Sequence, residues 1–253
     1  MTLGGVGRAL SPYLSITVIV VAWELVSAGE LVNTFFLPRF SSIVLQMVEM
    51  IVDGSLIQHA GISLLRAMGG FVLAAVVGTA IGLGMARTRA LHWTFDLAIS
   101  VGNPAPKIAL LPAFILWFGI GHESKILMVA LSCVFPVVLS TYMGALGVNR
   151  LLIWSALSMG TTERAMFKRV VLPHTLPFIF AGLQIALPMA LIVVFVTEMV
   201  AGGGGLGFLL IYSARFFEIP REFVALFTVL ILGFALDRLL LFTRRKALAW
   251  HEG

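Results

Sequence analysis

Four polar or constrained residues lie within apolar stretches of this sequence and could contact a solute. Lys107 directly follows Pro106, Gln184 lies inside an apolar run, and Glu198 lies near the end of the same run. A charge inside a membrane costs about 2.5–3.5 kcal/mol on insertion scales, so it normally faces a cavity or a partner. We therefore expect Lys107 to attract an anion along a pathway, with Pro106, Gln184 and Glu198 as further candidates for its lining.

A purely structural role for these residues stays open. Lys107 could extend to a membrane interface, or it could pair with Glu198 or Glu24. Glu198 and Glu24 each lie near the end of an apolar run, so reaching the interface is the simpler interpretation for both.

Motifs for catalysis are missing from the sequence. There is no GxxxxGK[ST] loop for nucleotide phosphates and no GxSxG turn for a nucleophilic serine. The five histidines form no HxxxH pair, and Cys133 is the single cysteine. We therefore assign no catalytic residue, no metal and no cofactor to this chain.

The composition is that of a membrane protein. Hydrophobic residues make up 60% of the 253 positions and charged residues only 11%, whereas soluble domains are about a quarter charged. The net charge of +5 is of the kind that orients loops, and no nucleic-acid motif accompanies it. We predict an all-α membrane protein with one domain over residues 1–253 and a core at about 60–245.

About six apolar stretches are predicted to span the membrane. A bilayer requires about 20 apolar residues, and the first stretch is short. The third contains Pro104, Pro106 and Pro112, so we expect its backbone to be broken. The predicted spans are Tyr13–Ala28, Leu64–Ala86, Phe95–Phe118, Ile126–Leu146, Leu176–Val200 and Phe223–Phe242.

Three features outside this pattern carry further expectations. Phe40–Gln58 is amphipathic and is expected to lie on the membrane, with an ordinary packed helix as an equal alternative. Small residues recur every four positions in the second and fifth spans, which predicts close helix packing. Residues 202–205 are all glycine, which predicts a flexible loop.

Positive charge orients the predicted spans. The side rich in Lys and Arg is usually cytoplasmic. An even number of spans then places both termini in the cytoplasm. The richer side holds Arg8, Arg87, Arg89, Arg150, Arg164, Lys168, Arg169, Arg244, Arg245 and Lys246, and the other holds Arg39, Lys125, Arg215 and Arg221, with Arg66 close to its span.

The cytoplasmic segment 150–173 is predicted to form two short helices hinged at a glycine. Leu152, Ala156 and Met159 share one helical face, and Gly160 can end that helix in a left-handed conformation. Thr161 is expected to cap a second helix with Glu163 in its first turn. We expect Leu172-Pro173 to stop this second helix, because proline lacks an N–H.

This segment resembles the cytoplasmic signature of permease subunits of bacterial ATP-binding-cassette importers. The family signature begins with Glu-Ala-Ala, where this chain has Trp154, Ser155 and Ala156. The glycine follows at Gly160, and Leu172-Pro173 closes the signature at the family's spacing. Because tryptophan replaces the acidic residue, we expect docking to depend on apolar contact more than on a salt bridge.

A second set of residues resembles the branch that imports sulfonates, taurine and nitrate. It comprises Ile108–Pro112, Leu116–Gly121, Gly182–Ala186 and Gly205–Gly207. The family usually has arginine where this chain has Gln184. The resemblance extends over roughly Leu37 to Arg245, and it implies the type I importer permease fold.

The resemblance also implies the partners. A second copy of the permease would complete the pore, two cytoplasmic ATPase subunits would hold ATP and Mg²⁺, and an external solute-binding protein would deliver a small solute. Lipid would surround the chain in the cell inner membrane. The residues expected to contact the ATPase are Trp154, Ser155, Ala156, Met159, Gly160, Thr161, Thr162, Glu163, Arg164, Leu172 and Pro173.

Two other classes of protein remain as alternatives. A secondary transporter driven by an ion gradient would require paired carboxylates at mid-depth and an internal repeat. A membrane-embedded enzyme would require a cluster of His, Asp or Ser within the spans. Neither pattern is visible in the sequence.

Overall fold

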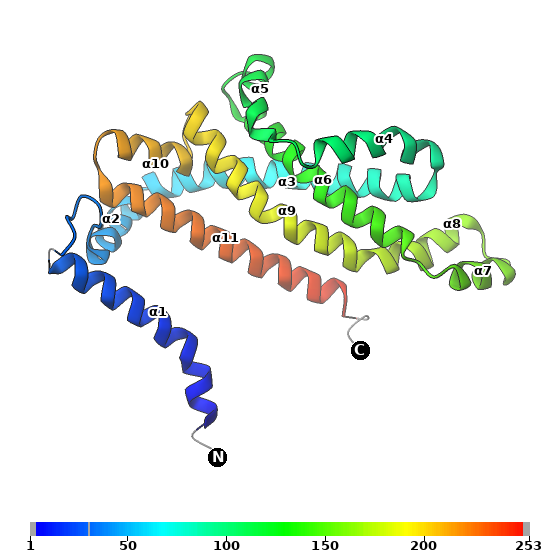
Figure 1. The fold of residues 1–253 in the computed structure, drawn as a ribbon, viewed down its shortest axis with the longest axis horizontal. Coiled ribbons are helices and arrows are strands. Elements are labelled where there is room, and N and C mark those ends of the chain that lie inside the picture. Colours follow the sequence, from blue (N-terminus) through cyan, green and yellow to red (C-terminus); the bar gives the residue numbers. More distant parts are fainter. Residues whose placement is uncertain (1–3, 30, 250–253) are drawn as a thin grey trace.

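The computed structural model describes residues 4–29 and 31–249, with side chains placed for 14–29, 31–149 and 151–249. Helices joined by turns make up this described part of the chain (Figure 1). Their bounds are α1 Gly4–Ala28, α2 Phe40–Val52, α3 Ser55–Arg87, α4 Arg89–Gly102, η1 Lys107–Leu110, α5 Leu111–Phe118, α6 His122–Leu146, α7 Arg150–Ser158, α8 Glu163–Met166, η2 Phe167–Val171, α9 Leu172–Ala201, α10 Leu206–Arg215 and α11 Ile219–Ala247.

Four helices in the described part of the chain are long and apolar enough to cross a membrane. They are α3, α6, α11 and the continuous helix Glu163–Ala201, which unites α8, η2 and α9. A fifth predicted span is the pair formed by α4 and η1–α5, which is bent by 96°. The predicted first span lies in α1, whose apolar part Leu14–Ala28 is shorter, and α1 diverges from the bundle in Figure 1. The all-α membrane class is confirmed.

Prolines account for the bend in the third predicted span, although not all three break it. The break falls between Gly102 and Lys107, where Pro104 and Pro106 lie. Pro112 instead occupies the first turn of α5. Proline is tolerated there because its missing N–H would have no partner within the helix.

The core is a bundle of α3, α6 and α9. Met128, Val129, Cys133 and Val137 of α6 are fully buried between the other two helices. Small residues permit the close approach, as the four-residue repeat predicts. A Cβ on Gly82 of α3 would lie 2.8 Å from Thr141 Cβ of α6.

Gly70 and its neighbour Gly69 form a matched pair for testing this packing. A Cβ at Gly70 would lie 2.6 Å from Ile126 O and 2.5 Å from Val129 Cβ, whereas at Gly69 the nearest atoms are 3.6 Å away. We expect Gly70→Ala to destabilise the protein by about 1–3 kcal/mol, the usual cost of overpacking. Gly69→Ala should be neutral or stabilising, because alanine favours a helix by about 1 kcal/mol over glycine. Thermal unfolding of both detergent-purified variants measures the difference; equal melting temperatures would contradict the packing argument.

A second, smaller core joins α2, α10 and α11. Ile43 and Met50 of α2 are each 1% exposed and pack against Leu209 of α10 and Val224 of α11. The predicted helix Phe40–Gln58 is wrong at its end, since α2 stops at Val52 and α3 begins at Ser55. Gly54 adopts a left-handed conformation with a φ of 80° in the turn between them.

Candidate functional site

The segment expected to contact an ATPase lies at one end of the bundle, between α6 and α9 (Figure 1). Asn149 caps α7 by accepting a hydrogen bond of 2.9 Å from Leu151 N–H. At the other end of α7, Gly160 N–H donates to Leu157 O and Thr161 N–H donates to Ala156 O. This is a Schellman ending, which requires a left-handed residue, and Gly160 has a φ of 77°. The predicted helix and its glycine end are confirmed, whereas the role of Gly160 as a hinge stays a prediction.

Two predictions about the second short helix are wrong. Thr162, rather than Thr161, caps α8 by accepting from Ala165 N–H at 3.4 Å. Leu172-Pro173 also does not stop the helix. The turn Phe167–Val171 is a π-helix, in which Leu172 N–H donates to Phe167 O. This wider turn leads directly into α9, whose first turn accommodates Pro173.

Several large apolar side chains of this segment are exposed. Trp154 is 59% exposed, Met159 78% and Leu151 64%. Of the residues expected to dock, Ala156 is buried, Thr161, Leu172 and Pro173 are half-buried, and the others are exposed: Trp154, Ser155, Met159, Gly160, Thr162, Glu163 and Arg164. A hollow of about 430 Å³ lies between α7 and the start of α9, lined in part by Leu152, Met159 and Pro173. Large exposed apolar side chains beside a hollow favour a protein partner.

Contacts also link this segment to the end of α3. Arg87 lies 3.9 Å from Glu163, with both side chains largely exposed. The Arg87 guanidinium also lies 5.7 Å from the centre of the Phe167 ring. The segment is therefore held against α3 as well as continuing into α9.

Lys107, a candidate for the solute pathway, lies at the bend between α4 and α5. Its Nζ donates to Asn103 O at 2.7 Å and to Ala105 O at 3.4 Å, and it lies 4.8 Å from the centre of the Phe135 ring. It therefore pairs with neither Glu198 nor Glu24. Pro106 directly precedes η1 at the same bend. Whether the two residues line the pathway stays a prediction.

Gln184, the next candidate, is half-buried in the middle of α9. Its Oε1 accepts a hydrogen bond of 2.7 Å from Arg244 Nη1 of α11. An arginine from another helix is thus bonded to this position.

Glu198 lies in a buried ionic cluster, so the simpler interpretation that it reaches the interface is wrong. Its side chain is 0% exposed and pairs with Arg66 Nη1 of α3 at 2.8 Å. Ser63 Oγ donates to the same carboxylate at 2.7 Å, and Gly207 N–H donates at 3.1 Å. Glu24 instead accepts from Ser41 Oγ at 2.7 Å, across the α1–α2 connection.

The loop Gly202–Gly205 is anchored by two buried cations, so the prediction of a flexible loop is wrong. Arg66 donates to Gly203 O at 2.8 Å and to Gly204 O at 2.7 Å. Lys125 donates to Gly202 O at 2.7 Å. All four glycines have positive φ values, so the run of glycines permits a backbone path that turns its carbonyl groups toward these cations.

Sequence reasoning missed Arg66 and Lys125 as cluster members. Both were counted with loop charges, although Arg66 is 1% exposed and Lys125 is 0% exposed. Arg66 lies within the predicted span Leu64–Ala86, and Lys125 directly precedes the predicted span Ile126–Leu146, which is the signal that could have indicated burial.

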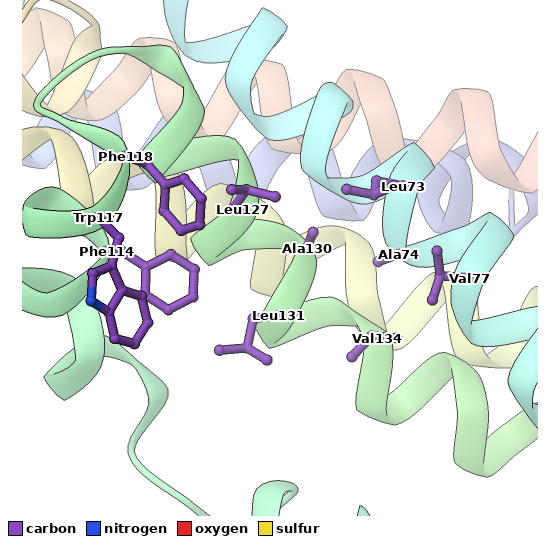
Figure 2. A pocket seen from close by; sticks show the side chains of 10 residues that line it. All are labelled: Leu73, Ala74, Val77, Phe114, Trp117, Phe118, Leu127, Ala130, Leu131 and Val134. Atoms are coloured by element: carbon purple, nitrogen blue, oxygen red, sulfur yellow. The ribbon is translucent and has the colours of Figure 1, made fainter. Parts of the chain in front are cut away.

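A further cavity of about 400 Å³ lies between α3, α5 and α6. Figure 2 shows Phe114, Trp117 and Phe118 of α5 facing Leu73 and Val77 of α3 across this space. Every lining residue is apolar, so the cavity offers no charged group to an anion. It suits a lipid chain or an apolar protein surface.

Comparison with known proteins identifies relatives over nearly the whole chain. The putative aliphatic sulfonates transport permease protein SsuC of Bacillus subtilis is 30% identical over 93% of this chain and 85% of its own length. The taurine transport system permease protein TauC of Escherichia coli is 28% identical over 94% of this chain and 88% of its own. The formylaminopyrimidine transport permease protein ThiX of Halalkalibacterium halodurans is 31% identical over 94% of this chain and 98% of its own length.

A solved structure shares the fold. The inward-facing MetNI methionine ABC transporter contains a chain that superposes with a TM-score of 0.62, covering 78% of this chain and 97% of that one at 20% identity. The family of binding-protein-dependent transport system inner membrane components matches residues 78–247, which include α7, α8 and the glycine loop. The chain belongs to this family of inner membrane transport components.

Proposed function

We propose that the α7–α8 segment receives the ATPase and that the chain conducts a small anion of the sulfonate class. The chain is a multi-pass inner membrane protein and a permease subunit of an ABC importer. Relatives named for aliphatic sulfonates and taurine support the solute class. Lys107, Pro106, Gln184 and Glu198 remain our candidates for the pathway and its supports.

The observation that carries the docking proposal is the apolar surface of α7. Trp154 and Met159 are 59% and 78% exposed at the end of the helix bundle, and Met159 also lines the hollow between α7 and α9. Tryptophan is enriched among the residues that dominate binding energy at an interface. A short helix with such a face fits a groove of a partner domain.

The remaining partners follow from the family and from exposed surfaces. On α5, Leu116 is 83% exposed and Trp117 67%, beside the apolar cavity of Figure 2, and we assign this face to a second copy of the permease. A binding protein would dock at the opposite end from α7. ATP and Mg²⁺ would be held by the ATPase, so that this chain itself catalyses nothing. The excess of Lys and Arg on one side supports our proposal that α7, α8 and both termini lie in the cytoplasm.

Replacement of Trp154 by alanine tests the docking surface. We expect at least a tenfold loss of affinity for the ATPase, because tryptophans at interface centres often contribute 2 kcal/mol or more, and 1.4 kcal/mol is tenfold. Titration of the labelled ATPase onto the full chain in lipid nanodiscs measures the affinity.

Phe234→Ala is the matched control, since Phe234 is 64% exposed but lies on α11, outside both proposed interfaces. It should leave the affinity for the ATPase unchanged. Equal affinities for the wild type and Trp154→Ala would place the ATPase elsewhere. The solute class is tested separately, by uptake of radiolabelled taurine and alkanesulfonates into cells expressing the complete importer; uptake of neither would reject it.

A further inference from the structure

Two short helices lie at the end of the bundle opposite α7. The helix α5 has 8 residues and α10 has 10, so at about 1.5 Å per residue neither crosses a bilayer core of about 30 Å. Each is joined to a long helix by a turn with positive-φ glycine. Gly119 lies between α5 and α6, and Gly202–Gly205 lie between α9 and α10. Such turns alone would let the two short helices move independently.

One buried ammonium group contacts both turns. Lys125 Nζ donates to Ile120 O in the α5–α6 turn at 2.9 Å and to Gly202 O in the α9–α10 turn at 2.7 Å. Gly121 O lies 3.5 Å away in the first turn. The side chain is 0% exposed, so water does not compete for these carbonyl groups.

Charge balance separates the role of Lys125 from that of Arg66. Arg66 and Glu198 already neutralise each other at 2.8 Å. Among the side chains placed in this cluster, no second carboxylate forms an ion pair with Lys125. Its hydrogen-bond acceptors are backbone carbonyl groups from the two turns. Removing Lys125 would therefore leave the ion pair balanced and would remove the hydrogen bonds by which its ammonium group joins the two turns directly.

The joined turns are also attached to the helix bundle. Arg66 of α3 donates to Gly203 O and Gly204 O and, through Nε, to His122 in the first turn of α6 at 3.2 Å. Leu206 N–H, at the start of α10, donates to Ser63 Oγ of α3 at 2.8 Å. The same α3, α6 and α9 bundle carries the α7–α8 segment at its other end.

We infer that Lys125 is a positioning residue, which makes α5 and α10 move as one unit with the bundle at this end of the translocation path. The inference rests on the proposed function, because motion of α7 and α8 would pass along the bundle to both short helices together. The ammonium group of Lys125 thereby fixes the α5–α6 turn directly against the α9–α10 turn.

Spin-label distances between α5 and α10 test this inference. Labels are placed at Leu116 and Arg215, both exposed, in a Cys133→Ser background, with the full chain in lipid nanodiscs. We expect a narrow distance distribution with Lys125 present and at least a twofold broader one for Lys125→Met, which keeps the side-chain length. An unchanged width in a folded Lys125→Met protein would overturn the inference.

A second variant covers the case in which Lys125→Met does not fold. A Cβ on Gly203 would lie 3.2 Å from Lys125 Nζ, and Gly203 has a φ of 79°, so Gly203→Ala should displace the ammonium group and broaden the distribution. Gly54→Ala is the matched control, since Gly54 has a φ of 80° with open space around it. Equal widths for both alanine variants would overturn the inference.

These measurements use neither ATPase nor solute. A failure in the distances therefore rejects the role of Lys125 alone, whereas normal distances with no ATPase binding reject the proposed function alone.

Discussion

Replacing Arg66 by methionine is expected to destabilise the permease by about 3–5 kcal/mol, which is the usual cost of removing one partner of a buried ion pair. The substitution would leave the Glu198 carboxyl group without its ion-pair partner at 0% exposure, with hydrogen bonds only from Ser63 and Gly207. It would also leave Gly203 O and Gly204 O without their donors. Thermal unfolding in detergent, followed by circular dichroism, measures the loss.

Arg87→Met is the matched control on the same helix. Arg87 is 51% exposed and lies 3.9 Å from Glu163, so solvent screens the pair. Exposed pairs contribute at most about 1 kcal/mol, and many contribute nothing measurable. A melting temperature for Arg66→Met as high as that of Arg87→Met would show that the buried cluster does not stabilise the fold.

Replacing Gly160 by proline is expected to uncouple ATP hydrolysis from transport while the complex still assembles. Gly160 has a φ of 77°, whereas proline is fixed near −65°, and the substitution also removes the N–H that donates to Leu157 O. The angle between α7 and α8 would change, but Trp154 would remain exposed. We expect the ratio of solute uptake to ATP hydrolysis to fall at least tenfold. Both rates are measured in the reconstituted importer.

Two further replacements separate backbone strain from bulk at this position. A Cβ on Gly160 would meet no atom within 4 Å, so any effect comes from φ rather than from space. Valine should impair transport, because a left-handed conformation costs a residue with a Cβ about 1–2 kcal/mol. Asparagine tolerates this conformation and should transport at close to the wild-type rate. Normal uptake by Gly160→Pro would refute the hinge.

Local rules were enough to predict many elements from the sequence. The end of α6 at Leu146 and the end of α7 before Gly160 match the expectations, because apolar periodicity and a left-handed glycine are decided within a few residues. The broken third span was also predicted, since Pro104 and Pro106 remove backbone donors wherever they lie.

The failures concern contacts between distant segments. Arg66 and Glu198 are 132 positions apart, so only the folded bundle shows that they meet. Lys125 looks like a loop charge until the glycine carbonyl groups are placed around it. Pro173 looks like a helix end because a π-turn that accommodates it has no reliable signature in sequence.

The length of the membrane-crossing helices determines how far a bound ATPase would lie from the lipid. The helix Glu163–Ala201 has 39 residues and therefore measures about 58 Å, against a hydrocarbon core of about 30 Å. Arg244, Arg245 and Lys246 avoid that core, and Arg244 reaches Gln184 in the middle of α9. The excess length therefore projects at the α8 end. An ATPase bound there would not contact the lipid headgroups. Its affinity for the α7–α8 segment should therefore not depend on bilayer thickness.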